Sequence, residues 1–224
     1  MTLDIEQLAQ LYPRLYHMAE PGSWSSIRRH GLLSTSALLK LFEVSGRQRF
    51  LIEAAHRPTS VALQHPAHGA AVIRDQKPMS NAALQRCLQD GLRPADWYRL
   101  LNRHVFFWLS RERLDRLLRA KAYRSKRHTI LEIDTARLIA SCGRNVFLTP
   151  INTGSTLFSP QPRGLRTFLR IAEYPYDEWR QRRKGSRDAI VELAVRGAVQ
   201  NIENVVVRVT DEGAGQPAVT IFTA

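Results

Sequence analysis

Hydrophobic residues in the first half of the chain recur mostly at helical spacing. Leu3, Leu8 and Leu11 predict a short helix that Pro13 stops, and the stretch 14–18 then predicts a strand. Five further helices are expected over Ser23–His30, Leu38–Glu43, Ser80–Gly91, from Pro94 onward, and over Arg111–Tyr123. Their starts carry serine caps or a proline, and glycines follow several of their ends. The segment from Phe50 to Gln76 follows no clear pattern.

Stretches rich in β-branched and aromatic residues predict strands, and most of them lie in the second half. They cover His104–Leu109, Thr129–Ile133, Asp188–Val195, Asn204–Val209 and Ala218–Phe222. The uncharged segment from Asn145 to Pro162 is rich in Thr, Ser, Asn and Pro, which predicts a loop. Helices followed by strands favour an α+β fold over a doubly wound α/β sheet. No linker divides the chain, so we expect one domain over residues 1–224.

Composition indicates a reduced protein that works inside the cell. Cys87 and Cys142 are the only cysteines, and their spacing fits neither a disulfide framework nor a metal site. The histidines also lack metal-ligand spacing, so we expect no metal. The first six residues do not resemble a signal peptide, and no stretch approaches the ~20 apolar residues of a membrane helix. We therefore expect a cytoplasmic protein that makes no contact with membranes.

The net charge of +13 makes nucleic acid the first partner to consider, because each cation that meets a phosphate releases a condensed counterion. One basic run combines several of these charges near Trp179 and Tyr174. It consists of Arg180, Arg182, Arg183, Lys184 and Arg187. This run is either a solvated face or a surface that holds single-stranded DNA or RNA by charge and stacking.

Glu192 is the most informative polar residue. Alternation along its predicted strand places Ile190, Glu192 and Ala194 on one face. A carboxylate on so apolar a strand must pair, take up a proton or serve a site, because burying it unpaired is costly. The pattern alone leaves two interpretations open: an edge-strand side chain that faces water, or a carboxylate directed into a cleft.

Other polar positions allow two interpretations each. His17 is either a hydrogen-bonded structural residue or a site residue, and the cluster Arg74–Gln76 is either a surface turn or part of a pocket. The small residues of Asn152–Thr156 are able to wrap a phosphate or amide, or to form an ordinary turn. The chain has no Walker A loop, dinucleotide-binding glycine motif or nucleophile elbow, which removes several large enzyme classes.

The order of these segments resembles that of ADP-ribosyltransferase-like proteins. Leu15–Met18, followed by a helix that ends in Ile27–Ser34, resembles their opening strand with a histidine, a short helix and a "GL" turn. Val105–Ser110 resembles the second motif, with Phe107–Trp108 where the polymerases carry a tyrosine, and Val191–Val195 resembles the strand with the catalytic glutamate. The resemblance is closest to DarT-type toxins, and looser to poly-ADP-ribose polymerases and RNA 2′-phosphotransferases. The chain also resembles an uncharacterised bacterial family with RDQ.P, VFFW.S, NTGST and VELAV blocks.

The resemblance implies a mixed or antiparallel split β-sheet of ADP-ribosyltransferase type and NAD as substrate. Glu192 would then be the catalytic carboxylate beside the ribose, with Arg74 or Arg113 pairing with the pyrophosphate or positioning the acceptor. The implied NAD-binding residues are His17, Gly31, Leu32, Phe107, Trp108, Ser110 and Arg113. Among these, His17 would bind the adenosine-side ribose, and Phe107 or Trp108 would stack on the nicotinamide ring.

The sequence therefore predicts an NAD-dependent ADP-ribosyltransferase, a toxin or defence enzyme that acts on nucleic acid. Two alternatives remain at this point. One is a non-catalytic nucleic-acid-binding protein, and the other is an enzyme of similar fold, such as an NAD glycohydrolase or an RNA 2′-phosphotransferase. The sequence does not identify an antitoxin partner.

Overall fold

The computed structural model describes residues 3–157, 159–183 and 189–224. The strands are β1 Arg14–Ala19, β2 Leu32–Leu33, β3 Val61–His65, β4 Gly69–Ile73, β5 His104–Trp108, β6 Arg127–Asp134, β7 Val146–Thr149, β8 Leu169–Arg170, β9 Glu192–Arg196, β10 Ala198–Val199, β11 Val206–Gly213 and β12 Gln216–Thr223. The helices are α1 Ile5–Leu11, α2 Trp24–His30, α3 Thr35–Leu41, α4 Gly46–Glu53, α5 Asn81–Cys87, α6 Pro94–Asn102, α7 Arg111–Arg119, α8 Thr135–Cys142 and α9 Tyr176–Arg182. Short 3-10 helices are η1 Gly143–Asn145, η2 Leu165–Thr167, η3 Ile171–Glu173 and η5 Ile202–Asn204. Among the residues described, no helix is long and apolar enough to cross a membrane.

Eight strands form the main sheet, in the order β12-β11-β6-β1-β5-β9-β7-β8, and each neighbouring pair is antiparallel. β1 pairs with β6 over six positions, but with β5 at one position only, Tyr16 opposite Trp108. The sheet therefore nearly divides between β1 and β5. No further pair joins the two strands among the described residues.

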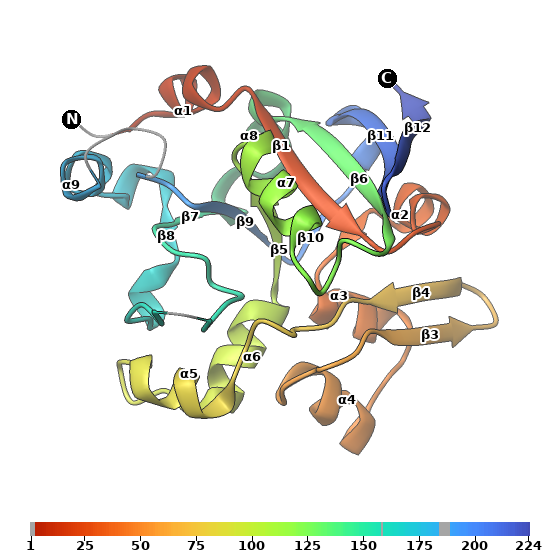
Figure 1. Ribbon diagram of the computed structural model, residues 1–224, viewed down its shortest axis with the longest axis horizontal. Coiled ribbons are helices and arrows are strands. Elements are labelled where there is room, and N and C mark those ends of the chain that lie inside the picture. Colours follow the sequence, from red (N-terminus) through yellow and green to blue (C-terminus); the bar gives the residue numbers. More distant parts are fainter. Residues whose placement is uncertain (1–2, 158, 184–188) are drawn as a thin grey trace.

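Figure 1 shows two groups of elements in the molecule. The main sheet with α1, α7 and α8 fills one part of the molecule, and α3 to α6 with the β3–β4 hairpin fill the other. The largest core packs residues of the sheet against α1, α2 and α8, including Leu15, Leu131 and Leu193. A separate small core around Leu39 and Leu63 holds α3, α4 and the hairpin together. We call residues 35–76 the hairpin module.

The predicted α+β class is confirmed, with several corrections. Ser80 and Ser34 cap α5 and α3 through their hydroxyls, whereas Ser23 precedes α2 without a capping bond. Neither α4 nor the β3–β4 hairpin was expected. Apolar and polar residues do not alternate in the sequences of β3 and β4, although more and less buried positions largely do in the structure. The segment expected to be a loop after Asn145 contains β7, whose apolar residues lie in the sheet interior. The division into helices first and strands later is also too simple, since β1 and β5 precede α8 and α9.

Candidate functional site

A cavity of about 350 Å³ lies where the sheet divides. Its wall includes β1, the α2–β2 turn and β5 on one side, and the hairpin module from Ala71 to Gln76 on the other. Most of the site residues predicted from the sequence line this cavity. They are His17, Gly31, Leu32, Arg74, Phe107, Trp108 and Glu192. Five segments of the sequence therefore meet at one cavity.

Glu192 begins β9 and is only 4% exposed. It lies opposite Trp108 on β5 and opposite Thr149 on β7, which places it in the sheet interior rather than on an edge strand. The Oγ1 atom of Thr153 donates to Oε2 of Glu192 at 2.7 Å, and the Thr153 N–H donates to the same oxygen at 3.1 Å. The carboxylate is thus both in the cavity wall and held by the loop after β7.

The environment of Glu192 favours its protonated form. Burial raises the pKa of Glu192 to about 7, although the hydrogen bonds from Thr153 and Thr149 and the charge of Arg113 oppose the rise. A carboxyl group with this pKa changes charge near neutral pH. Such a group is suited to holding or releasing a proton, and perturbed titration within a cavity is typical of functional sites.

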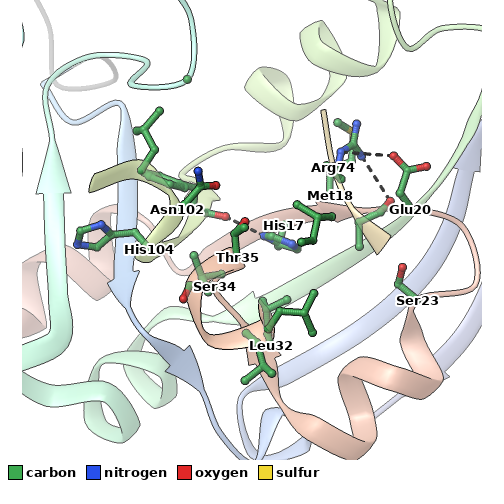
Figure 2. A pocket seen from close by; sticks show the side chains of 18 of the residues that line it. His17, Met18, Glu20, Ser23, Leu32, Ser34, Thr35, Arg74, Asn102 and His104 are labelled. Atoms are coloured by element: carbon green, nitrogen blue, oxygen red, sulfur yellow. Dashed lines mark hydrogen bonds and ion pairs between the residues drawn. The ribbon is translucent and has the colours of Figure 1, made fainter. Parts of the chain in front are cut away.

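His17 lies on β1 at the edge of the division. Its Nδ1 atom donates to the carbonyl oxygen of Phe106 on β5 at 2.9 Å, and its ring lies against that of Phe107 with 5.7 Å between centroids. Burial lowers the pKa of His17 to about 4, against the effect of the Phe106 carbonyl. The imidazole is therefore neutral at physiological pH. In Figure 2 it lies between the Arg74–Glu20 pair and the side chains of Asn102 and His104.

Arg74 follows β4, in the wall formed by the hairpin module. Its Nε atom lies 3.9 Å from a carboxylate oxygen of Glu20, and its guanidinium packs over the ring of Tyr123 at 5.2 Å. Nη1 lies 3.4 Å from Nδ1 of His128. These contacts hold the cation at the cavity wall, so the pocket interpretation of Arg74–Gln76 fits better than a surface turn.

Gly31 allows close contact between the α2–β2 turn and β10. Its φ is +82°, and a Cβ at this position would lie 2.8 Å from the carbonyl oxygen of Val199. Only glycine tolerates both the backbone conformation and the contact. This turn brings Leu32 against the cavity, where the "GL" pair is expected from the resemblance.

Arg57 is a cavity-lining residue that sequence reasoning missed. It is 6% exposed, and its Nε donates to the carbonyl oxygen of Arg74 at 2.8 Å. The other guanidinium nitrogens donate to the carbonyl oxygen of Ile52 and to Oδ1 of Asn102. Burial lowers the pKa of Arg57 to about 10, so the charge remains at neutral pH. Arg57 ties the hairpin module to the end of α6, through contacts that no local pattern reveals.

Ser110 and Arg113, two residues predicted to bind NAD, do not line the cavity. Ser110 caps α7, where its hydroxyl accepts a bond from the Arg113 N–H at 3.4 Å. Arg113 acts on Glu192 through its charge, which favours the ionised carboxylate. Ser110 therefore has a structural role, and Arg113 influences the Glu192 carboxylate without lining the cavity.

The basic run predicted for nucleic acid lies partly on α9, away from the cavity (Figure 1). Arg182 and Arg183 already pack over the ring of Trp179, at 5.3 and 5.0 Å from its centroid. Tyr174 is buried and its hydroxyl donates to the carbonyl oxygen of Ala189. Neither ring is thus an open platform for bases. Arg180 is exposed, and Lys184 and Arg187 lie outside the described residues.

Comparisons with known proteins place the chain in a family without assigning it an activity. No curated protein matches the sequence. A family model described as a family of unknown function (DUF7002) matches residues 13–206, a range that includes His17, Arg74, Trp108 and Glu192. The match covers most of the chain, and the protein belongs to the DUF7002 family.

Proposed function

We propose that this protein is an NAD-dependent ADP-ribosyltransferase whose active site is the cavity between β1 and β5. The main observation in support of this proposal is that the segments resembling the transferase motifs converge on one cavity. The strand with His17, the turn at Gly31–Leu32, and the strands with Trp108 and Glu192 all line it. An antiparallel sheet that nearly divides beside the cavity supports the same proposal. A volume of about 350 Å³ is within the usual range of small-molecule sites.

The chemistry needs a carboxylate where Glu192 lies. When the bond between nicotinamide and ribose breaks, its electron pair leaves with nicotinamide and positive charge develops on the ribose. A carboxylate beside the sugar stabilises that charge. With a pKa of about 7, Glu192 is partly ionised at neutral pH, and the developing positive charge favours its ionised form further. An acceptor nucleophile then bonds to the same ribose carbon and gives up its proton.

The remaining lining residues would bind the substrate. In this proposal His17 hydrogen-bonds a ribose hydroxyl, Trp108 packs against the nicotinamide ring, and Arg74 pairs with the pyrophosphate. The Nε atom of Arg74 lies 3.9 Å from a carboxylate oxygen of Glu20, and this ion pair holds the guanidinium at the cavity wall. A guanidinium suits this task because it makes two parallel hydrogen bonds to phosphate oxygens.

The charge distribution favours nucleic acid as the acceptor. From Arg116 to Arg127 the chain carries six cations and no acidic residue. Leu117 and Tyr123 of this segment line the cavity, while the side chains of Arg119 and Arg124 are exposed. A strand of nucleic acid bound along this segment would pass the cavity that Glu192 also lines. We call residues 116–127 the basic segment.

The proposal is tested with purified protein and NAD labelled on its adenylate part. Single-stranded DNA, RNA and cell lysate serve as acceptors, and wild type is compared with Glu192→Gln. Glu203→Gln is the matched control, because it makes the same change at an exposed ion pair with Arg28. We expect label transfer to fall about 100-fold in Glu192→Gln and to stay unchanged in the control.

Each other outcome contradicts the proposal in a distinct way. Nicotinamide release without label transfer would identify a glycohydrolase. Product formed only from 2′-phosphorylated RNA would identify a phosphotransferase. No turnover of NAD with any acceptor would leave a nucleic-acid-binding protein as the better interpretation.

A further inference from the structure

The carboxylate of Glu192 is held from one side only. The hydroxyl of Thr149, on the neighbouring strand, lies 3.3 Å from Oε2, and Thr153 donates two hydrogen bonds to that same oxygen. None of the hydrogen bonds among the described residues involves Oε1 of Glu192. One carboxylate oxygen therefore faces protein donors, and the other is left for whatever enters the cavity.

Arg163 holds Thr153 in place. Arg163 is 2% exposed, and its Nη1 atom donates to the carbonyl oxygen of Thr153 at 3.1 Å. Its Nε atom donates to the carbonyl oxygen of Gln161 at 3.0 Å, and its guanidinium packs over the ring of Trp97 at 5.7 Å. A buried arginine is costly unless its donors are satisfied. Here it links the loop to α6.

The loop from Asn152 to Thr156 is also fixed at its far end. The N–H of Thr156 donates to the carbonyl oxygen of Pro78 at 2.9 Å, and its hydroxyl accepts from the N–H of Ser80 at 2.8 Å. Ser80 caps α5, so the loop is anchored to the start of that helix. The backbone of Arg163 pairs with Cys87 at the end of the same helix. Both anchors thus depend on α5.

We propose that Thr153 and Arg163 are positioning residues of this site: Thr153 fixes one oxygen of Glu192 so that the other meets the ligand, and Arg163 fixes Thr153. This inference rests on the proposed function for the identity of the ligand, which is the ribose of NAD. The orientation itself is a property of the chain and is measurable without NAD. A carboxylate whose orientation is fixed before the ligand arrives loses little entropy in the reaction.

The charged groups that act on Glu192 come from two elements, Arg113 on α7 and Arg163 beyond the loop. Both favour the ionised carboxylate, as do the bonds from Thr153. Removing the Thr153 hydroxyl therefore raises the titration midpoint of Glu192. A hydrogen bond to a charged group corresponds to a shift of about one pH unit or more.

The test is a ¹³C NMR titration of protein labelled at its glutamate carboxyls, with the Glu192 signal assigned by its loss in Glu192→Gln. Thr153→Val removes the hydroxyl and keeps the size, and Thr153→Ser keeps the hydroxyl. We expect a rise of about one pH unit in the first and none in the second. Thr129→Val is the matched control, since it removes a buried hydroxyl that donates to another carboxylate, that of Asp211, and should leave the Glu192 midpoint unchanged.

Arg163→Lys tests the second step, because lysine keeps the charge but lacks the planar fork that holds Thr153. We expect the Glu192 midpoint to rise, by less than in Thr153→Val. An unmoved midpoint in Thr153→Val, or an equal shift in Thr129→Val, would overturn the role of Thr153. An unmoved midpoint in Arg163→Lys would overturn the role of Arg163. If the midpoints move as expected in a protein that does not turn over NAD, the positioning stands and the proposed function fails.

Discussion

At the scale of single residues, burial affects the pKa values of the site residues more than neighbouring charges do. Burial is the largest cause of the raised pKa of Glu192 and of the lowered pKa of both His17 and His104. In each case burial favours the neutral form. The cavity thus contains a carboxyl group and two imidazoles that are all easier to hold uncharged than they would be in water.

The raised pKa of Glu192 predicts how stability depends on pH. An unfolded glutamate loses its proton near pH 4.5, whereas folded Glu192 keeps it to about pH 7. Between these values the folded state binds more protons, so the contribution of Glu192 is present at low pH and is lost as pH rises. Relative to Glu192→Gln, the free energy of unfolding of the wild type should fall by about 3 kcal/mol between pH 4.5 and 7.5.

Urea denaturation of both proteins across this range measures the difference, and other titrating groups cancel in the comparison. If the free energies of unfolding of wild type and Glu192→Gln change in parallel from pH 4.5 to 7.5, the pKa of Glu192 is not raised in the folded protein.

At the scale of elements, the proposed nucleic-acid acceptor has two candidate binding sites. One is the basic segment, which runs from the end of α7 to the start of β6, and the other is the group of cations on α9. Among the described residues, no carboxylate forms an ion pair with Arg119 or Arg124. Arg182 on α9, by contrast, packs over Trp179. Only the basic segment also contributes to the cavity wall. An acceptor strand is therefore expected on the basic segment.

Charge reversal distinguishes the two elements. The double substitution Arg119→Glu with Arg124→Glu should weaken binding of a single-stranded oligonucleotide at least 10-fold at 0.15 M salt. It should also reduce the slope of log K against log salt by about 1.4, since each lost phosphate contact is worth about 0.7. Arg180→Glu with Arg182→Glu is the matched control, and fluorescence anisotropy at several salt concentrations measures both. An equal loss in the control would assign the binding to α9 or to net charge alone.

Local signals account for the elements that the sequence predicts correctly. Ser80 and Pro94 mark the starts of α5 and α6, because a cap and a proline act within one helical turn. The β3–β4 hairpin has no such signal. Buried and exposed positions alternate along β3 in the structure, but Val61, Ala62 and Leu63 are all apolar, so the sequence shows no alternation of apolar and polar residues. A strand of this kind forms because another part of the chain covers it.

The sequence likewise predicts those site residues that lie in local motifs and misses those that depend on distant contacts. His17 and Glu192 lie in short motifs, and the structure brings both to the cavity. Arg57 has no motif, since its partners Arg74 and Asn102 are 17 and 45 residues away. Thr153 was visible only as one of several small polar residues in a loop. Its bond to Glu192 crosses 39 residues and depends on the register of β7 with β9.

At the scale of the whole molecule, the cavity lies between two hydrophobic cores of unequal size. The main core spans the sheet, whereas the small core of the hairpin module contains Leu39, Phe42, Ile52, Leu63 and Ile73 as buried residues. A small core buries less apolar surface and has a lower free energy of local unfolding. The wall that carries Arg57 and Arg74 is thus the less stable half of the site.

Leu63→Ala tests this difference in stability. Truncation of a buried leucine costs about 2–5 kcal/mol, and here the loss should appear as local opening of residues 35–76. Hydrogen–deuterium exchange should accelerate in the hairpin module while β6 and β9 stay protected. Leu131→Ala, in the main core, should instead accelerate exchange throughout the sheet. Uniform acceleration in Leu63→Ala would show that the molecule opens as a single unit.

The bond from His17 to the carbonyl oxygen of Phe106 has a consequence for what the cavity accepts. A carbonyl oxygen has no proton to give, so Nδ1 must carry the hydrogen. With a pKa of about 4 the ring holds only that one proton near neutral pH, and Nε2 is left with a bare lone pair. The tautomer is locked across the physiological range. A ligand atom that contacts Nε2 must therefore be a hydrogen-bond donor. A free hydroxyl group can donate to Nε2, whereas the same oxygen carrying a methyl or a phosphate cannot.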